Sequence, residues 1–270
     1  MLEFVGLGLY DERSITRRGA EAIRAADVAY LEAYTSVLAG TTVERLEAVH
    51  GRSIEVLDRD AVERHADDLL DGAATSRVAF LTGGDPMVAT THVDLRLRAH
   101  DRGIETRLVH GTSAQTAAAG LTGLQAYRFG RSATVPFPEH APGDAVPPSV
   151  FDAIDANRAR GLHTLLFLDI ALDDVDRAVL RDALDDRCLD APAAADQLAN
   201  RRPDALGVAV ARAGSDAPVV AADRLEVLAS ADLGPPLHLL VIPGTLHDME
   251  AEALRAFADA PAALVEAARA

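Results

Sequence analysis

The sequence predicts an α/β protein built around largely parallel β-structure. Short apolar runs with the length of strands recur along the chain, helical patterns lie between several of them, and glycines follow several of the runs. The 270 residues are 49% hydrophobic, which is enough to bury roughly 70–75% of the unfolded surface in one large or two modest domains.

The elements are expected in a regular order. The predicted strands cover residues 2–5, 53–57, 78–81, 105–109, 164–168, 206–211 and 237–242. Helices are predicted at 16–29, where Thr16 is a start signal, and at 93–102 and 245–258. A boundary near residue 111 gives an N-terminal domain of residues 1–111 and a C-terminal domain of residues 112–270.

Two stretches interrupt this alternation. The segment "VPFPEHAPGDAVPPS" (135–149) is too rich in proline for regular helix or a central strand, and is predicted to be an ordered excursion. An Ala- and Asp-rich stretch, 182–204, is predicted to be an exposed helix and loop.

Composition excludes several classes of protein. The chain lacks an uninterrupted apolar run of the 18 or so residues that a membrane span needs, and its N-terminus lacks the basic region of a signal peptide. Cys188 is the single cysteine, so an internal disulfide and a CxxC metal site are both excluded. A cytoplasmic protein without a membrane contact is the simplest expectation.

The charge balance is strongly acidic. The net charge is −16, and all 26 basic residues are arginine. Such a surface repels phosphate backbones, so direct nucleic-acid binding is not expected. The acidity has two explanations, GC-rich codon bias and adaptation to molar intracellular salt, and the second is favoured.

Two glycine-rich turns follow predicted strands in the first half. "VGLGLYD" resembles a dinucleotide fingerprint, but Asp11 stands where the third glycine is needed, which disfavours a nicotinamide enzyme. "FLTGGDPMVATTH" places Asp85 at the end of a strand. Its carboxylate is predicted either to anchor a ligand or to cap a helix beginning near Val88.

Other candidate residues lie at later strand ends. Ser113, in "HGTSAQTAAAG", opens a helix of small residues and is predicted to be an N-cap, a cofactor contact or both. A hydrolase using Ser113, His110 and Asp85 is disfavoured because there is no GxSxG motif. A lone histidine in a strand, such as His238 in "PPLHLLVIPG", is more often a core residue than a ligand. The histidines of the chain also lack the spacing of a metal site.

At the level of longer segments, the chain resembles the diphthine synthase family of the tetrapyrrole-methylase superfamily. The matching segments, which run through nearly the whole chain in order, are "GLGLYDERSIT", "EAYTSVLAGTT", "FLTGGDPMVATTH", "GLTGLQAYRFGRSATVPFPE", "RGLHTLLFLDI", "VARAGS" and "PPLHLLVIPGTLHDMEAEAL". The family pattern has proline in place of Gly83 and a bulkier residue in place of Ala114.

The resemblance implies an archaeal, homodimeric methyltransferase of two α/β domains, with S-adenosyl-L-methionine bound in the cleft between them and S-adenosyl-L-homocysteine as product. The implied protein substrate is translation elongation factor 2, whose 3-amino-3-carboxypropyl-histidine is methylated up to the trimethylammonium form in diphthamide biosynthesis. The cofactor contacts carried over from the family pattern are Leu9, Asp85, Val88, Ser113, Ala114, Leu168, Ala211 and His238. No metal is implied, and no catalytic base can be named.

The sequence leaves two alternative functions open. A corrinoid-precursor C-methyltransferase would share the fold and cofactor, but "YTSVLAG" and "GLHTLLFLDI" favour the first family. A non-enzymatic binding module on the same fold is disfavoured because the pattern of cofactor-contacting residues is intact.

Overall fold

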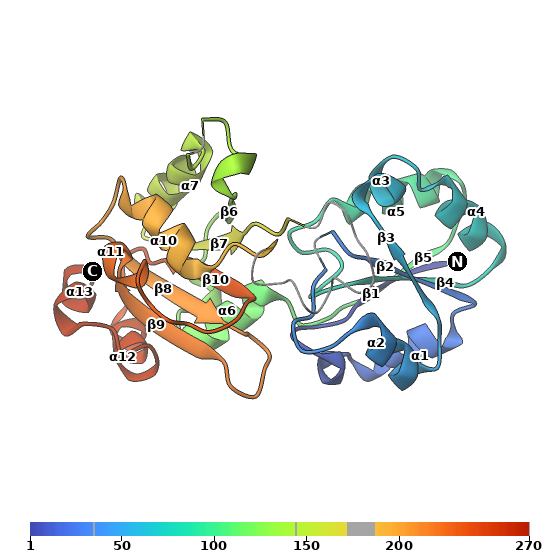
Figure 1. Ribbon diagram of the computed structural model, residues 1–270, viewed down its shortest axis with the longest axis horizontal. Coiled ribbons are helices and arrows are strands. Elements are labelled where there is room, and N and C mark those ends of the chain that lie inside the picture. Colours follow the sequence, from blue (N-terminus) through green and yellow to red (C-terminus); the bar gives the residue numbers. More distant parts are fainter. Residues whose placement is uncertain (35, 144, 172–186, 270) are drawn as a thin grey trace. The chain divides into compact units, whose positions relative to one another are not determined.

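The computed structural model describes residues 1–34, 36–143, 145–171 and 187–269 (Figure 1). Among them, two compact units can be distinguished. The first comprises Met1–Ser113 and Ala171, and the second comprises Ala114–Ile170 together with the described chain from residue 187 onward. The division falls after Ser113, whereas the sequence predicted it after residue 111. No helix of the described chain combines the length and apolar character needed to cross a membrane.

The first unit contains a five-stranded sheet in which every pairing is parallel. Its strands are β1 (Leu2–Gly6), β2 (Val28–Glu32), β3 (Ile54–Leu57), β4 (Val78–Thr82) and β5 (Thr106–Val109), in the order β3-β2-β4-β1-β5. The central strands β1 and β4 are buried along their whole length. This burial explains why their sequences are continuously apolar rather than alternating.

Helices cover both faces of this sheet. α1 (Arg17–Ala25) and α2 (Val43–His50) lie on one face, and α3 (Arg59–Glu63), α4 (Asp67–Thr75) and α5 (His92–Asp101) lie on the other (Figure 1). The short 3-10 helix η1 (Glu12–Ser14) follows β1. α1 begins where predicted, because the Thr16 side chain accepts the Gly19 N–H at 3.0 Å. The predicted helix to residue 29 is wrong, since α1 ends at Ala25 and β2 begins at Val28.

The second unit contains a mixed sheet. Its strands are β6 (Ala133–Val135), β7 (Thr164–Leu168), β8 (Leu206–Ala211), β9 (Val219–Arg224) and β10 (His238–Ile242), in the order β6-β7-β10-β8-β9. Only β6 and β7 are parallel, and the other pairings are antiparallel. The prediction of largely parallel structure therefore holds for the first unit and is wrong for the second.

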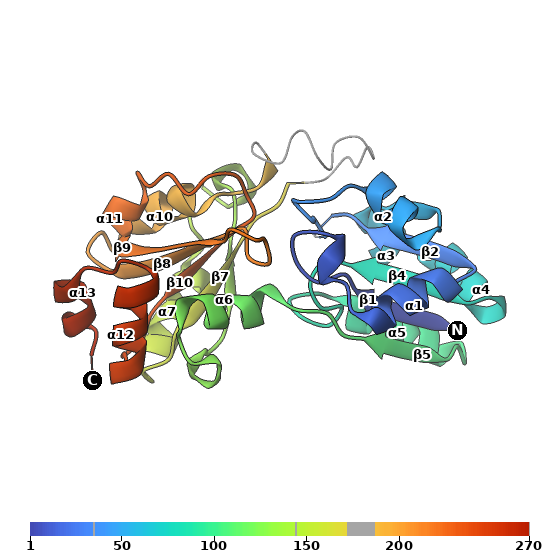
Figure 2. The same cartoon turned by 90° about the horizontal axis from the view of Figure 1, so that it is seen from below.

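Side chains alternate between two cores on the faces of this mixed sheet. Leu240 and Ile242 of β10 join a core with α7 (Pro148–Arg158), α10 (Ala191–Ala199) and α11 (Leu225–Leu228). Leu239 and Val241 join a core with α6 (Ala114–Thr122), α12 (Asp248–Phe257) and α13 (Ala262–Ala267). Figure 2 shows α10 and α11 on one side of the sheet and α6 and α12 on the other.

The two irregular stretches of the sequence have different outcomes. Among the described residues of 135–149, Val135 ends β6, Pro138–His140 form the 3-10 helix η3, and Pro148 begins α7. A second 3-10 helix, η2 (Ala126–Arg128), precedes β6. In 182–204, residues 182–186 lie outside the described chain. The rest holds α10, which is not an exposed helix, because Ala194, Ala195 and Leu198 are completely buried.

Candidate functional site

Three strand ends of the first unit meet in a cluster of glycines. β1 ends at Gly6, Gly84 follows β4, and Gly111 follows β5. A Cβ atom on Gly6 would lie 2.6 Å from the Gly84 carbonyl oxygen and from the Gly111 nitrogen, and one on Gly111 would lie 2.3 Å from that same oxygen. Only glycines allow the three backbones to approach this closely.

A pair of backbone hydrogen bonds joins two of these loops. Gly8 N–H donates to the Gly84 carbonyl at 3.2 Å, and Gly84 N–H donates to the Gly8 carbonyl at 2.7 Å. Gly84 has a φ of +69°, a conformation that glycine adopts without strain. The loops therefore form a fixed rim at the carboxyl end of the parallel sheet, where open α/β proteins bind ligands.

Asp85 lies on this rim and is held by two hydrogen bonds. Its Oδ1 accepts the Met87 N–H at 2.9 Å, and its Oδ2 lies 2.8 Å from Nδ1 of His110. The Asp85 side chain is only 9% exposed. The alternative that Asp85 caps a helix near Val88 is wrong, because α5 begins at His92 and Thr91 is its N-cap residue.

The other predicted residues of the first unit flank the same rim. Leu9 follows Gly8, and its carbonyl oxygen accepts both the Asp11 N–H, at 2.9 Å, and the Ser14 hydroxyl. Val88 N–H donates to the Asp85 carbonyl at 3.3 Å. Ser113 is buried, and its Cα is 3.9 Å from a Cβ built on Gly84. The sequence-predicted residues Leu9, Asp85, Val88 and Ser113 are therefore grouped around one sheet edge.

A buried hydroxyl at this edge offers a further polar group. Thr82 is the last residue of β4 and is 2% exposed. Its Oγ1 is buried and has no hydrogen-bond partner within the described part of the chain. An unsatisfied hydroxyl costs free energy unless it is paired, so the edge fits a ligand that carries hydrogen-bonding groups.

Three predicted residues of the second unit lie side by side. His238 is opposite Ala211 in the β10–β8 register, and the β10–β7 register places it next to Leu168. Leu168 and Ala211 both face the core with α7, α10 and α11. His238 is two residues before Leu240 on β10, so it lies on the same face of the sheet as Leu240. All three side chains are less than 9% exposed.

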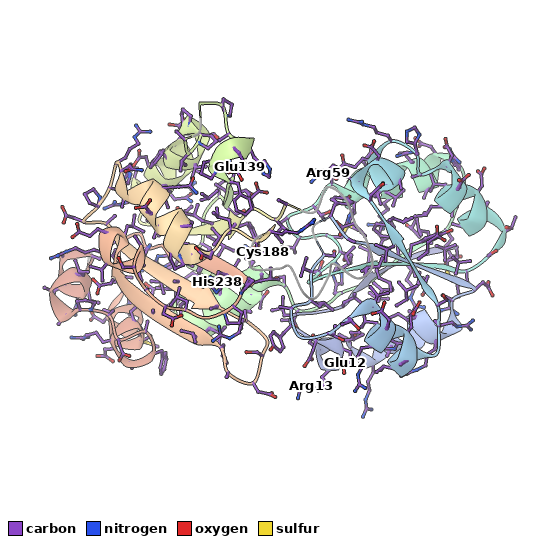
Figure 3. The ribbon with its side chains drawn as sticks, viewed as in Figure 1. Glu12, Arg13, Arg59, Glu139, Cys188 and His238 are labelled. Carbon is purple, nitrogen blue, oxygen red and sulfur yellow. The ribbon has the colours of Figure 1, made fainter. Side chains whose placement is uncertain are left out.

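His238 lies at the start of β10 (Figure 3), and hydrogen bonds fix its ring. Ala191 N–H donates to its Nδ1 at 3.2 Å, so the proton is on Nε2, which lies 3.1 Å from the Pro235 carbonyl oxygen. Burial lowers the pKa of the His238 ring below its usual value. This neutral, satisfied ring matches the expectation of a core histidine.

Ala114 differs from the other predicted residues of the second unit. It is the first residue of α6 and packs against the core on the opposite face of the sheet. The structure therefore brings Leu168, Ala211 and His238 together, but not Ala114 with them.

Sequence reasoning missed several polar residues near strand ends. His140 Nδ1 lies 2.7 Å from Asp169 Oδ2, directly after β7. His92 is 2% exposed, its Nδ1 lies 3.2 Å from the Pro86 carbonyl oxygen, and burial lowers its pKa. Asp169 is 29 positions from His140, so no local motif could have revealed that contact. Pro86 is only six positions before His92, inside the stretch "FLTGGDPMVATTH", but a sequence motif does not show that the histidine ring turns back onto that carbonyl. Within the described chain, no three His, Cys, Asp or Glu residues are grouped to hold a metal ion.

Comparison with known proteins gives consistent matches. The model of the tetrapyrrole (corrin/porphyrin) methylases matches residues 1–229. A diphthine synthase of Haloquadratum walsbyi is 55% identical, over 99% of this chain and 98% of the relative. One from Halobacterium salinarum is 57% identical, over 97% of this chain and 99% of the relative. A crystal structure of diphthine synthase matches with a TM-score of 0.87 and 41% identity, covering 98% of both chains.

Proposed function

The chain belongs to the tetrapyrrole (corrin/porphyrin) methylase family, and within that family we propose that it catalyses the diphthine synthase reaction. In that reaction S-adenosyl-L-methionine methylates the 3-amino-3-carboxypropyl-histidine of translation elongation factor 2. The observation that carries the proposal is the 55–57% identity to diphthine synthases over nearly the whole chain. The chain is thus a methyltransferase of this type.

The proposed cofactor contacts come from both units. Leu9, Asp85, Val88 and Ser113 supply the first set, and Ala114, Leu168, Ala211 and His238 supply the second. The glycine rim of the first unit supports the first set of contacts, because backbone groups there can approach a ligand closely. Asp85 in addition offers a carboxylate to a cationic or hydroxyl group of the cofactor. The burial of Leu168, Ala211 and His238 indicates that their contacts would be made largely by the backbone at the strand ends.

When bound, S-adenosyl-L-methionine supplies a methyl group already activated by the positive sulfur. The protein then has to align the acceptor amine with that methyl group and exclude water. Alignment of this kind can lower a barrier by roughly 7–11 kcal/mol. The amine must also be free of its proton before it attacks.

The remaining parts of the proposal concern partners. The protein would act in the cytoplasm on elongation factor 2 and work as a homodimer, as the family resemblance implies. Little aromatic material is available for stacking a flat tetrapyrrole, since aromatic residues make up 4% of the chain and tryptophan is absent. This composition favours a protein substrate over a corrinoid precursor.

The proposal is tested by incubating the protein with radiolabelled S-adenosylmethionine and elongation factor 2 that carries the aminocarboxypropyl-histidine. We expect label on the factor, with mass increments of one methyl group. The matched control is a factor whose target histidine is replaced, which should take up none. Label on that control, or efficient methylation of a corrinoid precursor instead, would overturn the proposal.

A further inference from the structure

We propose that His110 is the base that accepts the proton of the acceptor amine, an inference that rests on the function proposed above. His110 directly follows β5, next to Gly111 of the glycine rim. Its Nδ1 lies 2.8 Å from Oδ2 of Asp85, within hydrogen-bond distance. A carboxylate at this distance accepts the Nδ1 proton, so the lone pair of a neutral ring is on Nε2.

The two partners differ sharply in exposure. The Asp85 side chain is 9% exposed, whereas the His110 side chain is 68% exposed. Asp85 is itself fixed by the Met87 N–H, and it is the charged group that contacts His110 within the described chain. The ring is therefore oriented from behind by a buried carboxylate while its other nitrogen stays open. A general base is held in this way by a third group.

The position of His110 also suits a base. The loops after β1, β4 and β5 meet at the carboxyl edge of a parallel sheet, which is where ligands bind in open α/β folds. His110 belongs to the β5 loop, and its partner belongs to the β4 loop that carries the two glycines. An acceptor amine brought to this edge would meet an exposed imidazole nitrogen.

The chemistry of repeated methylation requires such a group. The acceptor is an aliphatic amine on a carbon that also carries a carboxylate, so it is an ammonium ion at neutral pH. The ammonium first gives a proton to Nε2 of His110. The freed lone pair then forms the N–CH3 bond as the S–CH3 bond breaks, and the sulfur keeps that electron pair. The new ammonium carries a proton that must leave before the next transfer, and His110 passes each proton to water.

Other histidines of the structure are less suited to this role. His163 is completely buried, and His92 and His238 are at most 5% exposed. His140 also pairs with an aspartate, but its side chain is 39% exposed and its ring packs edge-on against Phe137, with 5.6 Å between centroids. His110 combines the carboxylate partner with the more accessible ring.

The decisive variant is His110→Asn, because the asparagine amide can still donate to Asp85 but has no basic nitrogen. Its kcat, measured on modified elongation factor 2 at pH 7, should fall about 100-fold, as the loss of a general base predicts. The loss should shrink as the pH is raised, because a growing fraction of the amine is then already deprotonated. Affinity for S-adenosylmethionine, measured by calorimetry, should stay within about threefold of the wild-type value. The matched control is His100→Asn, an exposed histidine of α5, which should leave kcat unchanged.

Each outcome is decisive. A His110→Asn variant with kcat within twofold of wild type, or with a loss that is the same at every pH, overturns the assignment. If His110→Asn does not fold, a folded His110→Ala variant takes its place, and added imidazole should restore its activity. A lack of rescue by imidazole overturns the assignment of His110 as well. A wild-type protein that binds the cofactor but does not label the factor overturns the proposed function, and this assignment with it.

Discussion

Gly111 is a residue at which packing alone decides which side chain is tolerated. A Cβ there would lie 2.3 Å from the Gly84 carbonyl oxygen and 3.0 Å from Gly8 N. Both contacts are with backbone, so no flexible side chain can move aside. The glycine is therefore required by the close approach of three loops.

We expect Gly111→Ala to lower the free energy of unfolding by about 1–3 kcal/mol, the usual cost of overpacking, and to weaken cofactor binding because the rim must shift. Denaturant unfolding and calorimetry would measure the two effects. The control is Gly120→Ala in α6, where a Cβ would meet nothing within 4 Å. That change should stabilise the protein by about 0.5–1 kcal/mol. A Gly111→Ala variant as stable as wild type would show that the loops can separate freely.

His163 and Glu250 form a buried pair in the second unit. His163 Nε2 lies 2.9 Å from Glu250 Oε1, and Gly244 N–H donates to His163 Nδ1 at 3.0 Å. Burial lowers the pKa of His163. Burial alone would raise the pKa of Glu250, but hydrogen bonds from the His247 and Gln125 backbone N–H groups and from His163 together outweigh it, so that pKa is lowered too.

These shifts predict a protein that loses stability in acid. The folded state resists protonation of His163, so below a pH of about 6.5 the unfolded state binds more protons, and the free energy of unfolding falls as pH falls. Glu250 adds a further loss below about pH 4.5 by the same reasoning. Unfolding measured between pH 8 and pH 5 should show this decline, and His163→Asn should reduce its slope while the exposed His65→Asn should not. A flat profile from pH 7 to pH 5 would contradict the prediction.

At the scale of elements, the sequence predicts the buried strands well. Thr164–Leu168 and Leu206–Ala211 have the observed bounds, because continuous apolar runs of that length fit a core strand. β2 was missed because the alanines before it extend the helical pattern of α1, whereas pairing with β3 and β4 selects a strand. β6 and β9 are edge strands, and short or half-buried edges carry a weak apolar signal.

The candidate site was predictable residue by residue but not as an arrangement. Glycines after strands indicate a ligand-binding edge, and they place Asp85 there. The alignment of Leu168, Ala211 and His238 depends on the antiparallel pairing of β10 with β7 and β8, which no local pattern encodes. The Asp85–His110 contact joins residues that are 25 positions apart, and it depends on β5 lying beside β1 in the sheet.

At the scale of the whole molecule, the dominant feature is a net charge of −16 without lysine. Many carboxylates are paired on the surface, as in the contacts of Arg102 with Asp67 and Asp71. Exposed pairs of this kind contribute about 0–1 kcal/mol each. Salt weakens such pairs, which destabilises the fold, and it also screens the repulsion among the excess carboxylates, which stabilises it. With so large an excess of one sign, the relief of repulsion should outweigh the weakening of the pairs.

We therefore expect the melting temperature to rise between 0.1 M and 3 M KCl. The screening length falls from about 10 Å at 0.1 M to 3 Å at 1 M, so screening should account for the rise up to 1 M, and any further rise would reflect hydration of the carboxylates. A matched variant separates the charge effect from the rest. Glu21→Gln, Asp101→Asn and Asp152→Asn together remove three exposed negative charges. The triple variant should melt higher than wild type at 0.1 M KCl and at the same temperature at 3 M. Equal melting temperatures of the wild type in both salts would mean that the acidity does not govern stability.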